Sequence, residues 1–389
     1  MDWMNWEDQI ARHVRDIPRS GIRDFFDVVQ NVPDVVSLGI GEPDFVTPWH
    51  IREAAIYALE KGGTGYTSNL GLLTLRRAIS AYVEQHFGLS YDPEKEIIIT
   101  VGVSEAMDIA LRAILNPGDE VLYHEPCYVS YHPTVRLAHG IPVGVACPAA
   151  RNFAPQIEDL EGKITPKTRA LMLNFPTNPT GATLSKQQLE PIAKLVVDRD
   201  LLVLTDEIYA ELIYEGTHQS IAALPGMRER TIFLHGFSKA WAMTGFRLGY
   251  ACAPAPMIEA MIRIHQYSML CAPILSQEAA IEALRNGASD VERMRDEYRL
   301  RRNFLVRQLQ SMGLECHLPQ GAFYAFPSIR KTRQTSRDFA LALLQKQKVA
   351  VVPGDAFGPT GEGHIRCSFA AAMPTIEKAV ERMKVFLKA

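Results

Sequence analysis

Cysteine is scarce in this chain, and its spacing argues against two kinds of scaffold. The 389 residues include six cysteines, which occur singly and never as a C-x-x-C pair. They are Cys127, Cys147, Cys252, Cys271, Cys316 and Cys367. A disulfide framework or a structural zinc site is marked by paired, closely spaced cysteines. We therefore expect neither, and we expect a reducing compartment, with the cytoplasm as the default location.

Long apolar runs and an excess of one charge are also missing. No run approaches the ~18 apolar residues of a membrane span. The start, MDWMNWEDQIARHVRDIPRSG, contains acidic residues early and lacks the apolar centre of a secretory signal. With 41 basic and 44 acidic residues the net charge is −3, which gives no electrostatic reason to expect nucleic acid or an anionic membrane as partner. A slightly acidic chain can still carry a local cationic site for an anionic ligand.

The chain does contain a recurring pattern of apolar runs followed by helical segments. The runs end in polar or glycine-rich sequence, and they lie within 96–107, 119–128, 169–181, 201–209, 231–239 and 247–253. Short apolar runs without alternation are typical of strands buried on both faces, as in a parallel sheet. The segment 185–200 between two of them has helical spacing, with Ser185 as its expected N-cap. The pattern predicts an open α/β sheet.

After about residue 285 the sequence changes character. Residues 288–313 form a long, highly charged helical pattern that ends at Gly313. Short strand-like runs follow at 321–329 and 364–370, and the chain closes with an amphipathic helix. We expect a large domain over 45–285 and a smaller α+β domain made of 1–44 and 286–389.

Polar residues gather at the ends of the predicted strands, where open α/β sheets bind their ligands. Each of the following comes after an apolar run: Ser104, Tyr128, Asn178, Asp206, Tyr209 and Lys239. A lysine in such a setting either extends its ammonium to water or serves as an amine nucleophile whose pKa burial lowers. A buried carboxylate such as Asp206 either pairs with a cation, caps a helix, or keeps a ring nitrogen protonated.

An anion site is predicted beside these residues. Ser104 opens a helix directly after a strand, and free N–H groups at a helix start bind anions. Arg247 and Ser238 are further candidates for the same anion, because arginine offers paired contacts to phosphate. An imine-forming lysine, a carboxylate for a ring nitrogen, donors for a phenolate oxygen and a phosphate site together describe pyridoxal phosphate.

Nine motifs, in order along the chain, resemble those of the class I/II aminotransferases of pyridoxal-phosphate fold type I. They are VSLGIGEPDF (36–45), GYTSNLGLLTLRRAI (65–79), GVSEAM (102–107), NFPTNPTG (174–181), TDEIYAEL (205–212), GFSKAWAMTGFRLGY (236–250), PQGAFYAFPSI (319–329), VVPGDAFG (351–358) and HIRCSFA (364–370). The resemblance covers essentially the whole chain. It implies a large domain with a mostly parallel seven-stranded sheet between helices, plus a smaller α+β domain.

The resemblance assigns roles toward the cofactor. Lys239 is expected to bind pyridoxal phosphate covalently, and Asp206 to pair with its ring nitrogen. Asn178 and Tyr209 are expected to hydrogen-bond the phenolate oxygen, with Tyr128 stacked on the ring. The catalytic residues are Lys239, Asp206 and Tyr209.

The resemblance also assigns the phosphate and the substrate. The expected phosphate ligands are Val103, Ser104 and Glu105, through backbone or hydroxyl groups, and Ser238 and Arg247, with Tyr66 reaching in from the neighbouring subunit of a homodimer. Gly236 stands where several relatives have a phosphate-binding serine, and Ser238 is expected to substitute for it. Arg366 is expected to bind the substrate α-carboxylate, helped by Gly41 and Asn178.

The implied activity is transfer of an amino group from an L-amino acid to a 2-oxo acid such as 2-oxoglutarate by a ping-pong mechanism. The motif wording is most like enzymes that act on N-acetyl-L,L-diaminopimelate, aspartate or aromatic amino acids. No basic residue stands out as a ligand for a distal carboxylate, and aromatic residues are plentiful near the expected site. A C–S lyase or an aminocyclopropane-carboxylate-synthase-like lyase shares the same cofactor residues and remains an alternative.

Three further features stay open between a functional and a structural interpretation. Residues 17–26 form either a segment that closes over the site, with Gly21 as its flexible point, or an ordinary connection. His265, Tyr267 and Met269 either line the side-chain pocket or pack as one helix face. The spacing of the histidines at 124, 132 and 139 does not suggest a metal site.

Overall fold

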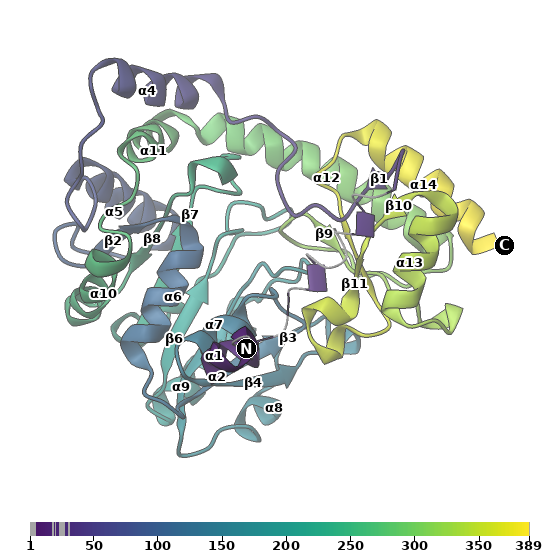
Figure 1. The fold of residues 1–389 in the computed structure, drawn as a ribbon, viewed down its shortest axis with the longest axis horizontal. Helices are drawn as coiled ribbons and strands as arrows, with labels where there is room; N and C mark the ends of the chain where they lie inside the picture. Colours follow the sequence, from purple (N-terminus) through teal and green to yellow (C-terminus); the bar gives the residue numbers. More distant parts are fainter. Residues whose placement is uncertain (1–4, 18, 20, 23–27, 30–31, 389) are drawn as a thin grey trace.

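A seven-stranded sheet forms the centre of the larger part of the molecule (Figure 1). The computed structural model describes residues 5–17, 19, 21–22, 28–29 and 32–388. The strand order is β2-β8-β7-β6-β5-β3-β4, with β2 (Ile97–Thr100), β3 (Glu120–Glu125), β4 (Ile141–Ala146), β5 (Thr168–Leu173), β6 (Leu202–Asp206), β7 (Thr231–Gly236) and β8 (Gly249–Cys252). Only β8 runs antiparallel to its neighbours in this sheet; the other pairings are parallel. The predicted mostly parallel α/β sheet is confirmed.

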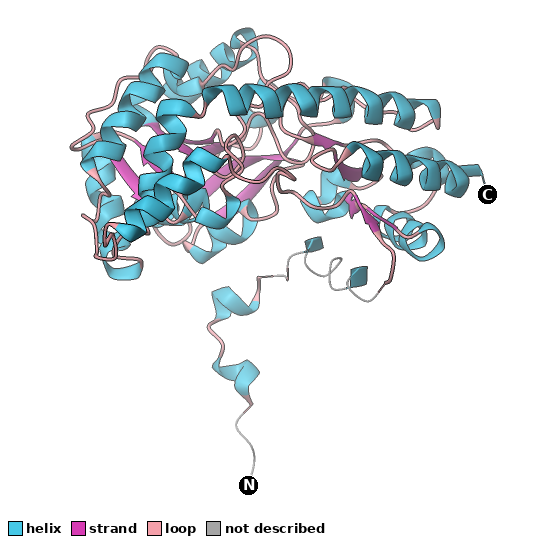
Figure 2. Cartoon of the chain, turned by 90° about the horizontal axis from the view of Figure 1, so that it is seen from above, coloured by secondary structure: helices cyan, strands magenta, loops and turns pink. Residues whose placement is uncertain are grey.

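The sheet is buried on both faces, as its sequence predicts. In β2, Ile98 packs toward one layer of helices, whereas Ile97 and Ile99 pack toward the other. The first layer contains α6 (Gly102–Ile114), α7 (Tyr131–Leu137) and α10 (Ala255–Ser268); the second contains α5 (Leu73–Phe87), α8 (Ile157–Glu161), α9 (Lys186–Asp198) and α11 (Ile274–Asn286). Figure 2 shows these helices on both sides of the strands. Two-sided burial explains why the strands have apolar runs rather than alternation.

Several elements begin or end where local sequence signals predict. Ser185 caps α9 with a complete capping box, in which Gln188 is the partner, so that the predicted helix start is confirmed. The long charged helix is α12, from Ala288 to Ser311, and Gly313 follows it with a φ of +84°. Strand β4 was not predicted, because it lies at the sheet edge, is only partly buried and contains a proline and a glycine.

A second, smaller group of elements lies at the other end of α12. A three-stranded antiparallel sheet has the order β11-β12-β9, with β9 (Tyr324–Ala325), β11 (Val352–Pro353) and β12 (Ile365–Ser368). Beside it, β1 (Val36–Ser37) pairs with β10 (Val349–Ala350), and α13 (Ser336–Gln347) and α14 (Met373–Lys388) pack on these strands. We keep the predicted domain boundaries as a proposal; α12 begins at Ala288, close to the proposed boundary at 286.

Helix α4 (Trp49–Glu60) packs against α11, and short helices α1 (Trp6–Gln9) and α2 (Arg12–Arg15) precede it near the N-terminus. Much of 17–26 lies outside the described residues, so the proposed closing role of that segment stays a prediction. None of the described helices combines the length and the apolar character needed to cross a membrane.

Candidate active site

One cavity of about 830 Å³ brings together residues from both parts of the molecule. It lies beyond the carboxyl ends of the parallel strands, where ligand sites of open sheets occur. Of the residues predicted for the site, the following line it: Gly41, Val103, Ser104, Tyr128, Asn178, Asp206, Tyr209, Ser238, Lys239, Arg247 and Arg366. Residues separated by more than 300 positions therefore meet at one place.

Lys239 follows β7 and has an amine whose pKa lies below that of an ordinary lysine. Its Nζ donates to the carbonyl oxygen of Gly41 at 2.9 Å. The rings of Tyr209 and Phe323 lie near it, with centroids 5.9 and 5.8 Å from Nζ. Burial lowers the pKa of Lys239 to about 8, and the nearby cation of Arg366 acts in the same direction while the carboxylate of Glu42 opposes it. An amine with this pKa is available as a nucleophile and as a base.

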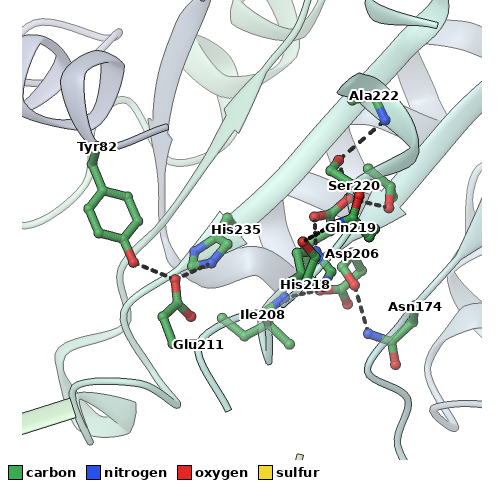
Figure 3. Close-up of polar contacts among 12 residues, drawn as sticks. Tyr82, Asn174, Asp206, Ile208, Glu211, His218, Gln219, Ser220, Ala222 and His235 are labelled. Carbon is green, nitrogen blue, oxygen red and sulfur yellow. Dashed lines mark hydrogen bonds and ion pairs between the residues drawn. The ribbon is translucent and has the colours of Figure 1, made fainter. Parts of the chain in front are cut away.

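Asp206 ends β6 and faces the cavity as a buried carboxylate. Tyr131 donates its hydroxyl to Oδ2 at 2.9 Å, and the Ile208 amide donates to Oδ1 at 3.3 Å. Burial raises the pKa of Asp206 to about 6, and these two hydrogen bonds limit the rise. The side chain of Asn174 fixes the strand end by donating to the Asp206 carbonyl oxygen at 2.7 Å (Figure 3).

Tyr131 was not identified from the sequence. It stands three residues after Tyr128, at the first position of α7, and its ring packs edge-on against that of Tyr128. In the sequence, the only signal for a role of Tyr131 at the site is its spacing of about one helical turn from Tyr128, the residue predicted to stack on the cofactor ring. The sequence could not show that Tyr131 would turn inward toward Asp206, because the two residues are 75 positions apart.

The other end of the cavity is built around Arg366, which is 2% exposed. Its Nη1 donates to the Asn178 side-chain oxygen at 2.9 Å, and its Nη2 donates to the Gly39 carbonyl oxygen at 2.7 Å. Its Nε has no hydrogen-bond partner among the described residues. The guanidinium lies over the ring of Tyr324, 4.5 Å from the centroid. A buried cation with an unused donor is suited to binding a carboxylate.

Two hydroxyls meet between these ends. The Tyr209 and Tyr324 hydroxyl oxygens are 2.9 Å apart. Burial raises the pKa of Tyr209 well above its usual value, so this hydroxyl stays protonated and can donate. Tyr324 was noted in the sequence only as an aromatic residue near the site. The structure brings it to the cavity wall, because β9 pairs with the strand that carries Arg366.

Arg247 lies against the first turn of α6. It has a left-handed backbone with a φ of 52°. A Cβ at Gly102 would stand 2.8 Å from its Nη2, and a Cβ at Gly249 would stand 2.5 Å from the Val103 nitrogen. These glycines therefore permit the close approach of the guanidinium to the free N–H groups of the helix start. Ser104 and Ser238 line the same region, so the group forms a cradle suited to phosphate.

Two predicted residues lie outside the cavity lining. The Glu105 carboxylate turns away, accepting from the Val101 amide at 2.5 Å and pairing with His265 Nδ1 at 2.6 Å. Tyr66 is 84% exposed, so a role for it in this chain requires another subunit. Tyr267 and Met269 are also exposed and do not line the cavity. Of the three residues only His265 is buried, so they do not pack together as one helix face.

The residues present fit a phosphorylated pyridine aldehyde. They supply an amine whose pKa burial lowers, a buried carboxylate, a protonated phenol and a phosphate cradle that added Cβ atoms would fill. Among the described residues, no group of three histidine, cysteine or acidic side chains is arranged to hold a metal ion.

Comparison with known proteins places the chain in a family. The model of aminotransferase class I and II matches residues 33–383. The chain is 53% identical over 378 residues to YugH of Bacillus subtilis (strain 168), whose name assigns it provisionally to the aminotransferases; the match covers 97% of this chain and 98% of that protein. It is 46% identical to an aspartate aminotransferase of Pyrococcus abyssi, covering 95% and 96% of the two chains.

Solved structures agree with this assignment. The aromatic aminotransferase from Pyrococcus horikoshii OT3 superposes with a TM-score of 0.90 at 47% identity, covering 94% of this chain and 98% of that one. The cavity, its lysine and its phosphate cradle thus occur in a fold that aminotransferases share. The protein belongs to the class I and II aminotransferases and is a pyridoxal-phosphate-dependent enzyme.

Proposed function

We propose that the protein transfers the amino group of a bulky neutral, above all aromatic, L-amino acid to a 2-oxo acid such as 2-oxoglutarate by a ping-pong mechanism. The observation that carries the choice of substrate is the set of cations in the cavity. Of the described residues that line it, only Lys239, Arg247 and Arg366 are cationic. Each of these has a proposed contact with the cofactor or the α-carboxylate, so the described lining of the cavity offers no further cation for the distal carboxylate of an acidic donor.

The proposed roles follow from the two ends of the cavity. Bound pyridoxal phosphate supplies an electron sink for the pair of electrons released when the α-proton leaves the substrate. Lys239 would accept that proton at Nζ and deliver it, within the same half-reaction, to the cofactor carbon that carried the aldehyde. Asp206 holds the ring nitrogen protonated, Tyr209 and Asn178 donate to the ring oxygen, and Tyr128 covers the ring face.

Phosphate and substrate have separate anchors in this proposal. Arg247, Ser104, Ser238 and the amides of the first turn of α6 hold the phosphate. Arg366 binds the α-carboxylate. The carboxylate oxygens take the place of the Asn178 side-chain oxygen and the Gly39 carbonyl oxygen, which accept hydrogen bonds from two Arg366 nitrogens. The backbone near Gly41 lies beside Lys239 Nζ and contributes to the same carboxylate site.

We also propose a homodimer with shared active sites. Helix α4 exposes Trp49, Ile56 and Tyr57 at 56%, 46% and 58%. Tyr66, the predicted phosphate contact for a neighbouring subunit, is exposed as well. An exposed apolar helix face together with such a residue is suited to binding a second copy of the chain. The six cysteines are free thiols, which supports the further proposal of a cytoplasmic location.

A donor panel tests the reaction and the substrate together. The holoenzyme is supplied with phenylalanine, tyrosine, aspartate and N-acetyl-L,L-diaminopimelate in turn, each with 2-oxoglutarate, and glutamate formation is measured. We expect the highest kcat/KM for the aromatic donors. Highest efficiency with aspartate would overturn the substrate proposal, and release of ammonia and an oxo acid without consumption of 2-oxoglutarate would indicate a lyase.

The dimer has its own test. Size-exclusion chromatography with light scattering should give twice the mass of the chain. Tyr66→Phe should raise the Kd of pyridoxal phosphate by about tenfold through loss of one hydrogen bond to a charged group. Tyr57→Phe removes an exposed hydroxyl from the same surface and should leave the Kd unchanged. An active monomer would contradict the shared site.

A further inference from the structure

A segment that crosses between the two parts of the molecule forms one wall of the cavity. At one end the Leu38 amide donates to Ala350 in β10, and the Ser368 amide donates to the Leu38 carbonyl oxygen. At the other end the Thr47 hydroxyl donates to the Ala242 carbonyl oxygen at 2.6 Å. Residues 38–47, which we name the crossing segment, thus connect the small sheet with the large one (Figure 1).

The crossing segment contacts two of the three described cations that line the cavity. The Gly39 carbonyl oxygen accepts from Arg366, and the Gly41 carbonyl oxygen accepts from Lys239. Gly41 is also tightly packed, because a Cβ there would stand 2.9 Å from the Tyr324 hydroxyl oxygen. Its position therefore sets the space in which a substrate carboxylate can bind.

Helix α12 holds this segment at its middle. Arg301 Nη1 donates to both carboxylate oxygens of Asp44, at 2.8 Å each, and Arg301 Nε donates to Glu297 at 2.9 Å. The guanidinium lies 5.1 Å from the centroid of Phe45, whose ring packs edge-on against Tyr298. The Arg301 side chain is 7% exposed and that of Asp44 is 24% exposed, so water screens this pair less than a surface ion pair.

We propose that Arg301 and Asp44 are positioning residues for substrate binding: they form a latch between α12 and the crossing segment that holds Gly39 and Gly41 in the conformation that receives the α-carboxylate. The inference rests on the proposed carboxylate site at Arg366. The latch touches neither cofactor nor substrate; it acts through the backbone of the crossing segment. Loss of the latch lowers the fraction of molecules with a competent carboxylate site, and apparent affinity falls by that fraction.

The neighbouring arginine provides a matched control. Arg302 is also buried and also pairs with a carboxylate, donating to the two oxygens of Glu215 at 2.8 and 2.6 Å and to the Pro319 carbonyl oxygen at 2.8 Å. Arg302 therefore lies on the same helix as Arg301, carries the same charge and also pairs with a carboxylate, but its hydrogen bonds go to residues outside the crossing segment.

The experiment compares Arg301→Met, Asp44→Asn, the double variant and Arg302→Met as holoenzymes. For the first three we expect the KM of phenylalanine and the Ki of 3-phenylpropionate, a carboxylate without an amino group, to rise about tenfold. The Kd of pyridoxal phosphate and kcat should stay within about twofold of the native enzyme. The double variant should be no worse than the more affected single variant, because the two residues act as one unit.

Arg302→Met separates positioning from stability. It should lower the melting temperature at least as much as Arg301→Met while leaving the KM and Ki unchanged. Equal KM changes in both arginine variants, or a change in kcat and cofactor Kd instead of KM, would overturn the latch. If Arg301→Met does not fold, Asp44→Asn carries the same test. Arg366→Lys is the reference for the proposed function: unchanged KM in that variant refutes the carboxylate site, whereas a raised KM there with unchanged latch variants refutes only the latch.

Discussion

The two ends of the cavity are assembled in different ways. The cofactor end is built from the ends of neighbouring strands in one sheet and the start of α6, with Lys239, Asp206 and Arg247 as its charged groups. The substrate end combines Gly39 and Arg366, which come from the crossing segment and β12. Cofactor binding therefore depends on one sheet, whereas recognition of the carboxylate depends on how two parts of the molecule are held together.

Removing Lys239 should have the largest effect, because this residue serves both ends. Lys239→Ala loses the nucleophile and the base, and we expect turnover to fall by about 10⁴-fold or more. Its pyridoxal phosphate should dialyse away, which absorbance of the dialysed protein measures. Near-normal turnover in this variant would remove the basis of the whole assignment.

Arg366→Ala should damage only the substrate end. The loss of a buried charge-assisted contact to a carboxylate predicts a rise in the KM of the amino donor of roughly 10²- to 10³-fold. The Kd of pyridoxal phosphate, followed by fluorescence titration of the apo-protein, should change little. A comparable loss of cofactor affinity would show that the two ends are not independent.

Arg247→Ala is the converse change. Removing one charge-assisted contact to phosphate should raise the Kd of pyridoxal phosphate by about 10- to 100-fold. At saturating cofactor the donor KM should be close to native. We therefore expect Arg366→Ala to change the donor KM and Arg247→Ala to change the cofactor Kd. If both variants change the same one of these two constants, the comparison between the two ends of the cavity is wrong.

Tyr131→Phe should produce a smaller, pH-dependent change at the cofactor end. Burial raises the pKa of Asp206 to about 6, and the hydrogen bond from Tyr131 opposes this rise. Without this hydrogen bond the pKa of Asp206 should be higher. As the pH is lowered, the carboxylate of the variant should therefore become protonated at a higher pH than in the native protein, and the Kd of pyridoxal phosphate should begin to rise at that higher pH. Titration of cofactor affinity between about pH 5 and 8 measures the shift; Tyr91→Phe removes a buried hydroxyl without a partner and should leave the curve unmoved.

The smallest expected effect concerns the ion pairs that link α4 to α11 and α12. His50 pairs with Glu282 at 2.8 Å and with Asp290 at 3.1 Å. Burial by itself lowers the pKa of His50, but the two carboxylates outweigh it and raise the pKa above 6.5. Because the folded pKa is raised, this stabilisation is complete below pH 6.5 and disappears as pH increases through the folded value. The difference in melting temperature between native protein and His50→Gln should shrink over that range; a constant difference would contradict it.

Much of the cofactor end could be predicted from the sequence, for a physical reason. A lysine or an aspartate directly after an apolar run must lie at the carboxyl end of a buried strand, and such ends of a parallel sheet share one edge. The position of Lys239 and Asp206 at one cavity therefore followed from the local pattern. Among the chemical roles open to these residue types, the family resemblance selected the ones proposed.

Other features depended on contacts that no local pattern contains. Tyr131, at the start of α7, donates to Asp206 across 75 positions of the chain, and the Glu105 carboxylate pairs with His265 across 160 positions. Strand β4 escaped prediction because an edge strand needs no continuous apolar run.

The sequence by itself determined the order of strands and helices, the capping of α9 and the residues available for chemistry, since these depend on neighbours a few positions apart. The tertiary structure decided which of those residues share a cavity and how Arg366 meets Gly39. It also decided that Arg301 of α12 holds the crossing segment through Asp44. That contact joins residues 257 positions apart, and its energy depends on burial and orientation, which arise only when the chain has folded.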